Sequence, residues 1–302
     1  MKIVIVVFSP GGHTKKVAEI IKESMEKKSV AVEIIDTTGK AIFDNSRSIQ
    51  AYLKSVIPPH DILMVGAPVY AHHFHYNVLS IIDALPSPGN GWGKFSIPFV
   101  TYGTINSGIS LYEAGNHLNK TGRKNIFALK IDSFHVMSRF LSTTINEGKP
   151  GKEIEPLMNE LADKIISLDI SQADKIIDIL PKLNYQKLTC KIKANTIFRE
   201  KFFQDRIYPQ LSFNKEKCVC CQKCIKKCPV QRLLLAEDGL DILKGNPACI
   251  HCGECIHACE FSALDFKTDE ASKAKWNKVF NQAIKGKGIL PSNEFPKTVL
   301  YY

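Results

Sequence analysis

Short apolar runs alternate with amphipathic stretches through the first 170 residues. Five runs rich in β-branched residues are typical of buried strands: 2–8, 30–36, 61–66, 95–102 and 125–131. Four stretches between or after them carry apolar residues at helical spacing: 14–28, 77–85, 107–120 and 153–167. Strands and helices that alternate in this way predict an α/β fold, with an open parallel sheet covered on both faces.

The pattern changes after residue 170. Residues 171–217 hold ten Lys and Arg against five Asp and Glu, and their apolar positions have helical spacing. We therefore expect four regions along the chain: an α/β domain over 1–170, a basic helical linker over 171–212, a small cysteine-rich domain over 213–270 and a tail over 271–302. The tail is polar and begins with a predicted helix around Trp276.

Eight of the ten cysteines form two runs with the same spacing, C-x2-C-x2-C-x3-C, offset by 31 residues (218 to 249). Three cysteines spaced in this way can surround one corner of an iron–sulfur cubane, while the fourth points toward a second cluster. The spacing thus predicts that one [4Fe–4S] cluster is held by Cys218, Cys221, Cys224 and Cys259. It predicts that the other cluster is held by Cys249, Cys252, Cys255 and Cys228.

Zinc is the alternative, because paired C-x2-C units also bind zinc. Two interleaved runs fit two separate tetrahedral sites poorly, so the spacing favours iron–sulfur clusters. Cys220 lies out of register inside the first run, and Cys190 stands alone in the linker. We expect neither to be a ligand. The segment resembles the bacterial two-cluster ferredoxins over about 55 residues, with Glu260 where the second motif of that family has proline.

A glycine-rich turn joins the first predicted strand to the first helix. Its glycines allow a close approach of the backbone to an anion, and the helix behind it offers unpaired N–H groups. The turn therefore predicts a phosphate site made by Ser9, Gly11, Gly12, His13 and Thr14. It matches neither the G-x-G-x-x-G fingerprint nor a P-loop.

Two more loops follow the third and fourth predicted strands, at the sheet edge where such folds bind ligands. Each offers a tyrosine, whose ring can cover a planar heterocycle. The candidate binding residues of these loops are Pro68, Val69, Tyr70, Ala71, Tyr102, Gly103 and Thr104. His72, His73 and His75 come directly after the first loop, and we expect a solvated or ligand-edge loop there rather than a metal site.

Together, the three loops resemble the flavodoxin superfamily over about residues 1–170, and the whole chain resembles proteins that fuse a flavodoxin-like domain to a two-cluster ferredoxin. The resemblance implies a sheet of order 2-1-3-4-5, bound FMN, and a small α+β domain with two [4Fe–4S] clusters. Gly11 replaces a hydroxyl residue of the family's phosphate loop. The loss of that hydrogen bond predicts weaker FMN binding.

These cofactors predict an electron-transfer protein that passes single electrons between two [4Fe–4S] clusters and a bound FMN. Its partners would be other redox proteins, such as an acidic ferredoxin or a low-potential oxidoreductase. The alternative is a flavin-dependent oxidoreductase that acts on NAD(P)H or a small acceptor, with residues 134–150 as a lid. No nucleophile–base pair stands out in the sequence, so the chemistry would be that of the cofactors.

The formal net charge of +10 leaves nucleic-acid binding open at first. However, the basic residues are not interleaved with aromatic residues as in known binding modules, so we expect no nucleic-acid partner. No signal peptide and no run long enough for a membrane span is visible in the sequence. We therefore expect a cytoplasmic protein without a membrane span.

Overall fold

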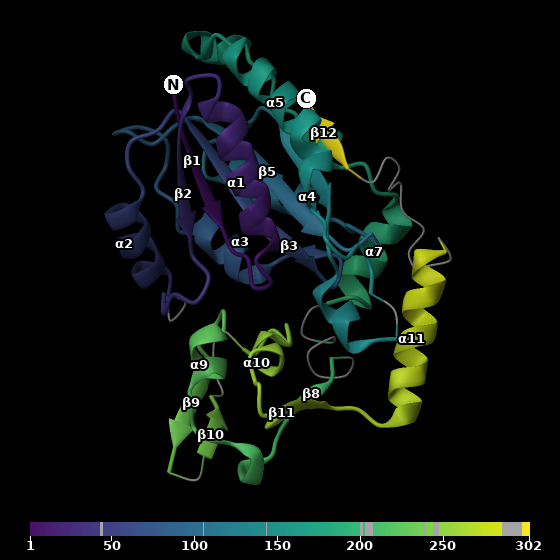
Figure 1. Ribbon diagram of the computed structural model, residues 1–302. Helices are drawn as coiled ribbons and strands as arrows, with labels where there is room; N and C mark the ends of the chain where they lie inside the picture. The colour runs from purple at the N-terminus through teal and green to yellow at the C-terminus, as the bar shows by residue number, and fades with distance from the viewer. Residues whose placement is uncertain are drawn as a thin grey trace.

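The computed structural model describes residues 1–42, 45–104, 106–142, 144–199, 202, 208–237, 239–243, 248–285 and 298–302. Figure 1 shows an upper body built around a twisted sheet and a smaller lower body below one end of that sheet. Helix α11 (Glu270–Ile284) runs upward beside them, so that the last residues of the chain lie against the upper body. Residues 286–297 of the predicted tail are outside the described residues.

The central sheet has the order β12-β7-β5-β3-β1-β2. Its five parallel strands are β1 (Lys2–Val7), β2 (Ala31–Asp36), β3 (Ile62–Tyr70), β5 (Phe95–Tyr102) and β7 (Ala128–Asp132). Numbered along the chain, these strands have the order 2-1-3-4-5, which is that of the flavodoxin-like doubly wound fold. The predicted fold class is therefore confirmed. Two short strands add to it: β4 (His73–Phe74) beside β3, and β6 (Lys124–Asn125) beside β5.

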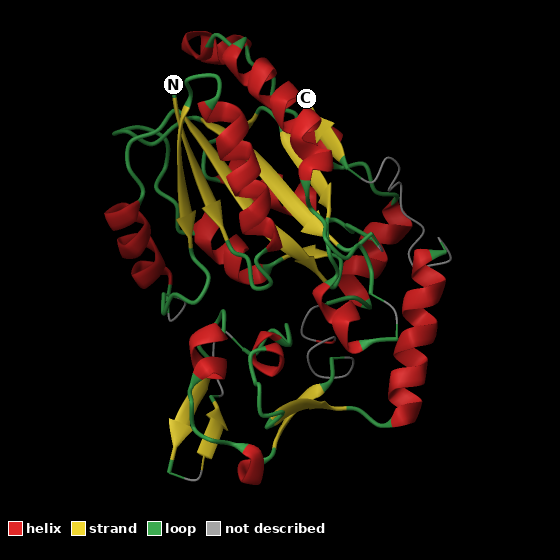
Figure 2. Ribbon diagram, in the orientation of Figure 1, coloured by secondary structure: helices red, strands yellow, loops and turns green. Residues whose placement is uncertain are grey.

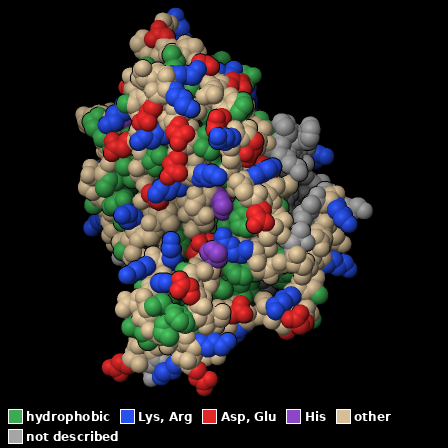
Figure 3. All heavy atoms as spheres, viewed as in Figure 1, with side chains coloured by type: hydrophobic (Ala, Val, Ile, Leu, Met, Phe, Trp, Pro, Cys, Tyr) green, Lys and Arg blue, Asp and Glu red, His purple; other side chains and the backbone are tan. Residues whose placement is uncertain are grey.

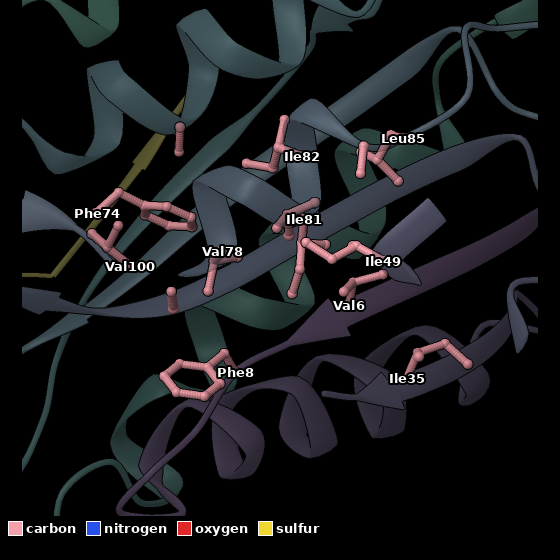
Figure 4. Close-up of a cluster of buried hydrophobic side chains, with 14 of the residues drawn as sticks. Val6, Phe8, Ile35, Ile49, Phe74, Val78, Ile81, Ile82, Leu85 and Val100 are labelled. Atoms are coloured by element: carbon pink, nitrogen blue, oxygen red, sulfur yellow. The ribbon is translucent and has the colours of Figure 1, made fainter. Parts of the chain in front are cut away.

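Helices cover both faces of the sheet. Alternate residues of β1 show the division, because Ile3 and Ile5 pack in one core while Val4 and Val6 pack in the other. The first core contains α1 (His13–Glu26) and α5 (Glu155–Ile166). The second contains α2 (Ser46–Val56), α3 (Tyr76–Asp83) and α4 (Ser110–Lys120), and part of it is drawn in Figure 4.

Two elements of this domain are not anticipated by the sequence pattern. Helix α2 buries only Ile49 and Leu53, so its apolar signal is short, and it begins where Asn45 accepts a hydrogen bond from the Ser48 N–H at 2.9 Å. Strand β12 (Val299–Tyr301) pairs antiparallel with β7. These three residues at the end of the predicted polar tail cover what would otherwise be an open sheet edge.

The basic linker forms short helices on the surface of the sheet domain. They are a 3-10 turn at Ile170–Lys175, α6 (Leu180–Leu183) and α7 (Leu188–Thr196). Helix α7 packs through Cys190 and Ala194, which are 2% and 0% exposed. Within the described part of the chain, no helix has the length and apolar content needed to cross a membrane.

The lower body contains the cysteine runs and two small antiparallel sheets (Figure 2). One sheet pairs β8 (Gln210–Phe213) with β11 (Leu264–Lys267), and the other pairs β9 (Leu233–Ala236) with β10 (Gly239–Ile242). The repeat in the sequence is visible in the fold. Each cysteine run contains one short helix, α9 (Lys223–Lys227) or α10 (Glu254–His257), and is followed by a strand.

His75, at the start of α3, is fully buried among aromatic rings. Its ring lies 4.7 Å from that of Phe8 and 4.8 Å from those of Tyr70 and Tyr76, measured between centroids. Burial lowers the pKa of His75 to about 3. The unfolded chain binds a proton below its ordinary pKa while the folded chain does not, so stability falls as the pH drops below about 6.5.

We predict that the His75→Asn variant loses less stability on acidification than the wild type. In the wild type, His75 Nδ1 accepts a hydrogen bond from the Asn77 N–H at 3.2 Å. An asparagine side chain can also accept this bond, but it does not titrate. Between pH 7.5 and 5.5 the loss of unfolding free energy should shrink by about 1.4 kcal/mol. Urea unfolding, followed by far-UV circular dichroism at both pH values, measures the free energy of unfolding. The exposed His257 supplies the control variant His257→Asn, and an equal effect in both variants would refute the prediction.

Candidate functional site

The eight cysteines of the two runs line two cavities. The inner cavity is lined by Cys228, Cys249, Cys252 and Cys255, together with apolar neighbours such as Val230 and Ile250. The outer cavity is lined by Cys218, Cys221, Cys224 and Cys259. Each cavity therefore takes three cysteines from one run and the fourth from the other run.

The two cavities differ in their exposure. In the inner set, Cys228, Cys252 and Cys255 are buried. In the outer set, Cys221 is exposed and the others are half-buried. Val219 and Phe261, which also line the outer cavity, are 54% and 46% exposed. The outer set thus faces the surroundings of the molecule, while the inner set belongs to its interior.

Burial also sets the ionisation of the inner thiols. It raises the pKa of Cys255 to about 12, and it raises the pKa of Cys252 well above that of a free thiol. A thiol of this kind becomes a thiolate only when positive charge is brought to it, as a metal centre does. The donor chemistry of both cavities, with four sulfurs each, fits a [4Fe–4S] cluster.

Backbone N–H groups point at the fourth cysteine of each run. The Arg232 N–H donates to Cys228 Sγ at 3.2 Å, and the Ala263 N–H donates to Cys259 Sγ at the same distance. Hydrogen bonds to the ligand sulfurs are among the factors that set the reduction potential of a cluster. The other two cysteines lie elsewhere: Cys220 is exposed, and Cys190 is buried in α7. Among the described residues, no three His, Cys, Asp or Glu side chains form a site for a single metal ion.

The phosphate loop has the geometry of an anion site. Gly12 has φ +81, which favours glycine, and a side chain there would meet nothing within 4 Å. The first N–H groups of α1 have no partner inside the helix. Ser9 Oγ accepts a hydrogen bond from the Lys15 N–H at 3.0 Å. The backbone N–H groups of His13 and Thr14 are therefore the ones left for a ligand. The Thr14 hydroxyl itself is buried and bonds to Thr101 Oγ1 at 2.7 Å.

The loop after β3 is a hairpin in the structure. Strand β3 continues through Pro68, Val69 and Tyr70, and Ala71 and His72 make the two-residue turn to β4 with φ +46 and +73. Two positive φ values are characteristic of a type I′ turn. Tyr70 is half-buried at this edge. Its ring packs edge-on against that of His75, with 4.8 Å between centroids.

The histidines after this turn are held in place rather than solvated. His73 Nδ1 lies 2.8 Å from Glu113 Oε1, and its Nε2 lies 3.0 Å from the Ala194 carbonyl oxygen of α7. His72 packs edge-on against the ring of Phe198, with 4.5 Å between centroids. Since both ring nitrogens of His73 face oxygen atoms of the protein, that ring joins the linker to the sheet domain.

The third predicted loop, Tyr102 to Thr104, reaches the same edge of the sheet. The Tyr102 ring is 3% exposed and lies 5.7 Å from Lys130 Nζ, so it faces the interior. Gly103 lies beneath His135, whose Cβ would be 2.4 Å from a side chain at position 103. The Thr104 hydroxyl donates to Asp132. All three predicted loops therefore meet at one edge.

A segment that the sequence analysis placed at the site only in the oxidoreductase alternative, as part of a lid over 134–150, lies over these loops. We call Phe134–Ser142, which follows β7, the bridging segment. Its Phe134 ring lies 5.3 Å from that of His13. At its other end Arg139 Nη1 donates to Glu254 Oε1 at 2.8 Å, and the Phe140 ring packs 4.9 Å from that of Phe266. It therefore links the phosphate loop to the lower body. Its signals in the sequence were the length of the loop and the residues His135, Met137 and Arg139 within it.

The loop of the inner cavity lies directly against the bridging segment. Gly253 has φ +74, and a side chain there would come within 2.4 Å of the Phe140 ring. A second contact joins the same two bodies, because the Gly39 N–H donates to the Pro229 carbonyl at 2.8 Å and Gln231 Nε2 donates to the Gly39 carbonyl at 2.6 Å. Both contacts place the inner cavity at the carboxyl edge of the sheet.

Residues 210–260 match the family of the 4Fe-4S dicluster domain. The chain thus joins a flavodoxin-like fold to a 4Fe–4S dicluster domain. The two parts correspond to the resemblance inferred from the sequence. A 4Fe–4S domain is an electron-transfer module, so the match supports an iron–sulfur cluster in this part of the chain and a role in redox electron transfer.

Three solved structures illustrate what the chain is similar to in part. The rubredoxin oxygen:oxidoreductase of Desulfovibrio gigas is 16% identical, with a TM-score of 0.39, and the match covers 60% of this chain but only 36% of that one. An archaeal flavodoxin is 18% identical over 55% of this chain and 99% of its own, with a TM-score of 0.34. An NADH:FMN oxidoreductase in its apo form is 19% identical over 61% and 98%, with a TM-score of 0.41.

If each cavity takes its fourth ligand from the other run, cysteine variants should lose iron in a different pattern than if each run held its own cluster. In a protein with Cys249→Ala and Cys252→Ala, the inner site is lost. Adding Cys228→Ala leaves the whole outer set, so about four irons per chain should remain after reconstitution. Adding Cys259→Ala instead removes one ligand of the outer set, and iron should fall close to zero. Iron and labile sulfide analysis of the two triple variants distinguishes the two arrangements. If the Cys259→Ala variant kept about four irons and the Cys228→Ala variant lost them, each run would hold its own cluster.

Proposed function

We propose that this chain is an electron-transfer protein that carries two [4Fe–4S] clusters and FMN, with its outer cysteine set turned toward a redox partner and its inner set turned toward the flavin domain. The clusters would supply single-electron chemistry, and the flavin would accept one or two electrons. The observation that carries the proposal is the position of the inner cavity beside the phosphate loop, through Gly253 and the bridging segment.

The loops at the carboxyl edge support flavin as the group bound there. Gly12 leaves open space for an anion at the N-terminus of α1, and Tyr70 offers a ring at the neighbouring turn. We assign the FMN phosphate to the turn of Ser9, Gly11, Gly12, His13 and Thr14. The isoalloxazine would lie beside Pro68 to Ala71 and Tyr102 to Thr104.

The surface around the outer cavity suits an acidic redox protein. Val219 and Phe261 supply exposed apolar contacts. Four exposed lysines surround the first cysteine run in the sequence: Lys215, Lys217, Lys226 and Lys227. Lys223 is held by Glu260 at 2.6 Å, so it adds less positive charge. Figure 3 shows charges of both signs mixed over the upper body and apolar side chains gathered on the lower one. A partner docked by such charges would bind less tightly at high salt.

The proposal is tested with protein reconstituted anaerobically with iron, sulfide and FMN. A viologen radical serves as the one-electron donor, and stopped-flow absorbance follows the flavin. Wild-type flavin should be reduced quickly. In Cys249→Ala/Cys252→Ala protein, which lacks the inner site, the rate should fall by about tenfold or more, while Cys220→Ala, a cysteine outside both cavities, should behave as the wild type.

Several results would contradict the proposal. Protein without bound iron after reconstitution, or with zinc in its place, would remove the cluster assignment. Equal rates of flavin reduction in the wild type and in the variant without the inner site would remove the assigned role of the inner set. Rapid flavin bleaching by NADH or NADPH alone would support the oxidoreductase alternative.

A further inference from the structure

The phosphate loop lacks one hydroxyl, and the structure shows what occupies the space. A side chain at Gly11 would place its Cβ 2.5 Å from Val136 Cγ1 of the bridging segment. A serine or threonine cannot stand there unless Val136 moves. The glycine therefore makes room for the bridging segment to lie on the turn. The same segment could supply a different group that binds the phosphate.

The bridging segment brings a guanidinium group to the turn. Arg139 lies 5.6 Å from the centre of the Phe134 ring, which in turn packs on the His13 ring. Burial lowers the pKa of His13, and the positive charges of Arg139 and Lys16 lower it further. Lys15, the other cation at this end of α1, is 3.3 Å from Asp36 and is engaged there.

The partner of Arg139 occupies the place of an anion. Glu254 Oε1, which accepts from Arg139 Nη1 at 2.8 Å, lies 3.7 Å from the Cβ position of Gly11. Both side chains are largely shielded, with 19% and 14% of their surface exposed. A carboxylate thus stands against the phosphate loop beside a cation, and it comes from the loop between Cys252 and Cys255. Charge-assisted bonds from arginine suit phosphate oxygens as well as carboxylates.

We propose that Arg139 is a phosphate-binding residue of the FMN site, and that Glu254 competes with the phosphate for it. The inference rests on the proposed function, since it assumes that this turn binds FMN. Arg139 replaces the hydroxyl that Gly11 lacks. Because Glu254 belongs to the inner cysteine loop, occupation of the phosphate site and the ion pair between the two bodies are linked.

The experiment compares FMN with riboflavin, which differs only in lacking the phosphate. Cluster-loaded, flavin-free protein is titrated with each flavin, and the quenching of flavin fluorescence gives the dissociation constants. Arg139→Gln should weaken FMN binding by about ten- to a hundredfold and change riboflavin binding by less than about twofold. Glu254→Gln should tighten FMN binding severalfold with riboflavin unchanged. Lys15→Gln is the matched control and should leave the FMN-to-riboflavin ratio near that of the wild type.

The outcomes separate the two proposals. If wild-type protein binds neither flavin, the proposed flavin function fails. If FMN binds and Arg139→Gln leaves its affinity unchanged, or weakens riboflavin equally, the role of Arg139 is refuted while flavin binding stands. Riboflavin binding by the variant also shows that it is folded. Weaker FMN binding in Glu254→Gln would refute the competition between Glu254 and the phosphate.

Discussion

One ion pair, Arg139 with Glu254, joins the two bodies of the molecule where they meet the first strand-to-helix turn. A shielded pair of this kind needs both partners in place, because either charge left alone would lose its compensation. Arg139 is positioned by the bridging segment, and Glu254 by the left-handed Gly253 that opens α10. This meeting of two short loops and the hydrogen bonds of Gly39 with Pro229 and Gln231 together set the position of the inner cavity beside the sheet.

The cysteine repeat then produces two sites with equal ligands and unequal surroundings. Both cavities have four cysteines, and in each the fourth cysteine accepts a backbone hydrogen bond at 3.2 Å. Three cysteines of the inner set are buried members of the core that continues into the sheet domain, whereas Cys224 and Cys259 of the outer set are half-buried at its margin. Exposure and burial change the potential of a cluster. A duplicated unit can therefore give two sites of different character through packing alone.

Much of the fold could be predicted because it depends on local pattern. The β-branched runs and the amphipathic stretches between them predicted an open parallel sheet, and the resemblance to flavodoxins implied its order 2-1-3-4-5; the structure confirms both. Helix α2 was not predicted, because two buried residues are too few for a periodic signal. Strand β12 was not predicted, because its pairing with β7 joins residues far apart in the chain. The hairpin at Ala71 and His72 was missed because neither residue is glycine, although both have positive φ.

The candidate site was predictable in part. The spacing of the cysteines could predict which four belong together, since a cubane imposes that spacing, and the structure places each such set around one cavity. The segment over 134–150 was considered only as a lid, and its contacts with Gly11, His13 and Glu254 could not be predicted, because all of them are non-local. Nor could the sequence show that the Tyr102 ring faces Lys130 in the interior.

Hydrogen–deuterium exchange tests most directly whether the inner cysteine loop holds the two bodies together. Loss of the inner site, in Cys249→Ala/Cys252→Ala protein, should speed exchange in residues 134–142 and in the first turn of α1. The matched variant Cys218→Ala/Cys221→Ala, which loses the outer site, should keep wild-type exchange in both regions. Unchanged protection after loss of the inner site, or equal loosening in both variants, would contradict this role of the inner cysteine loop.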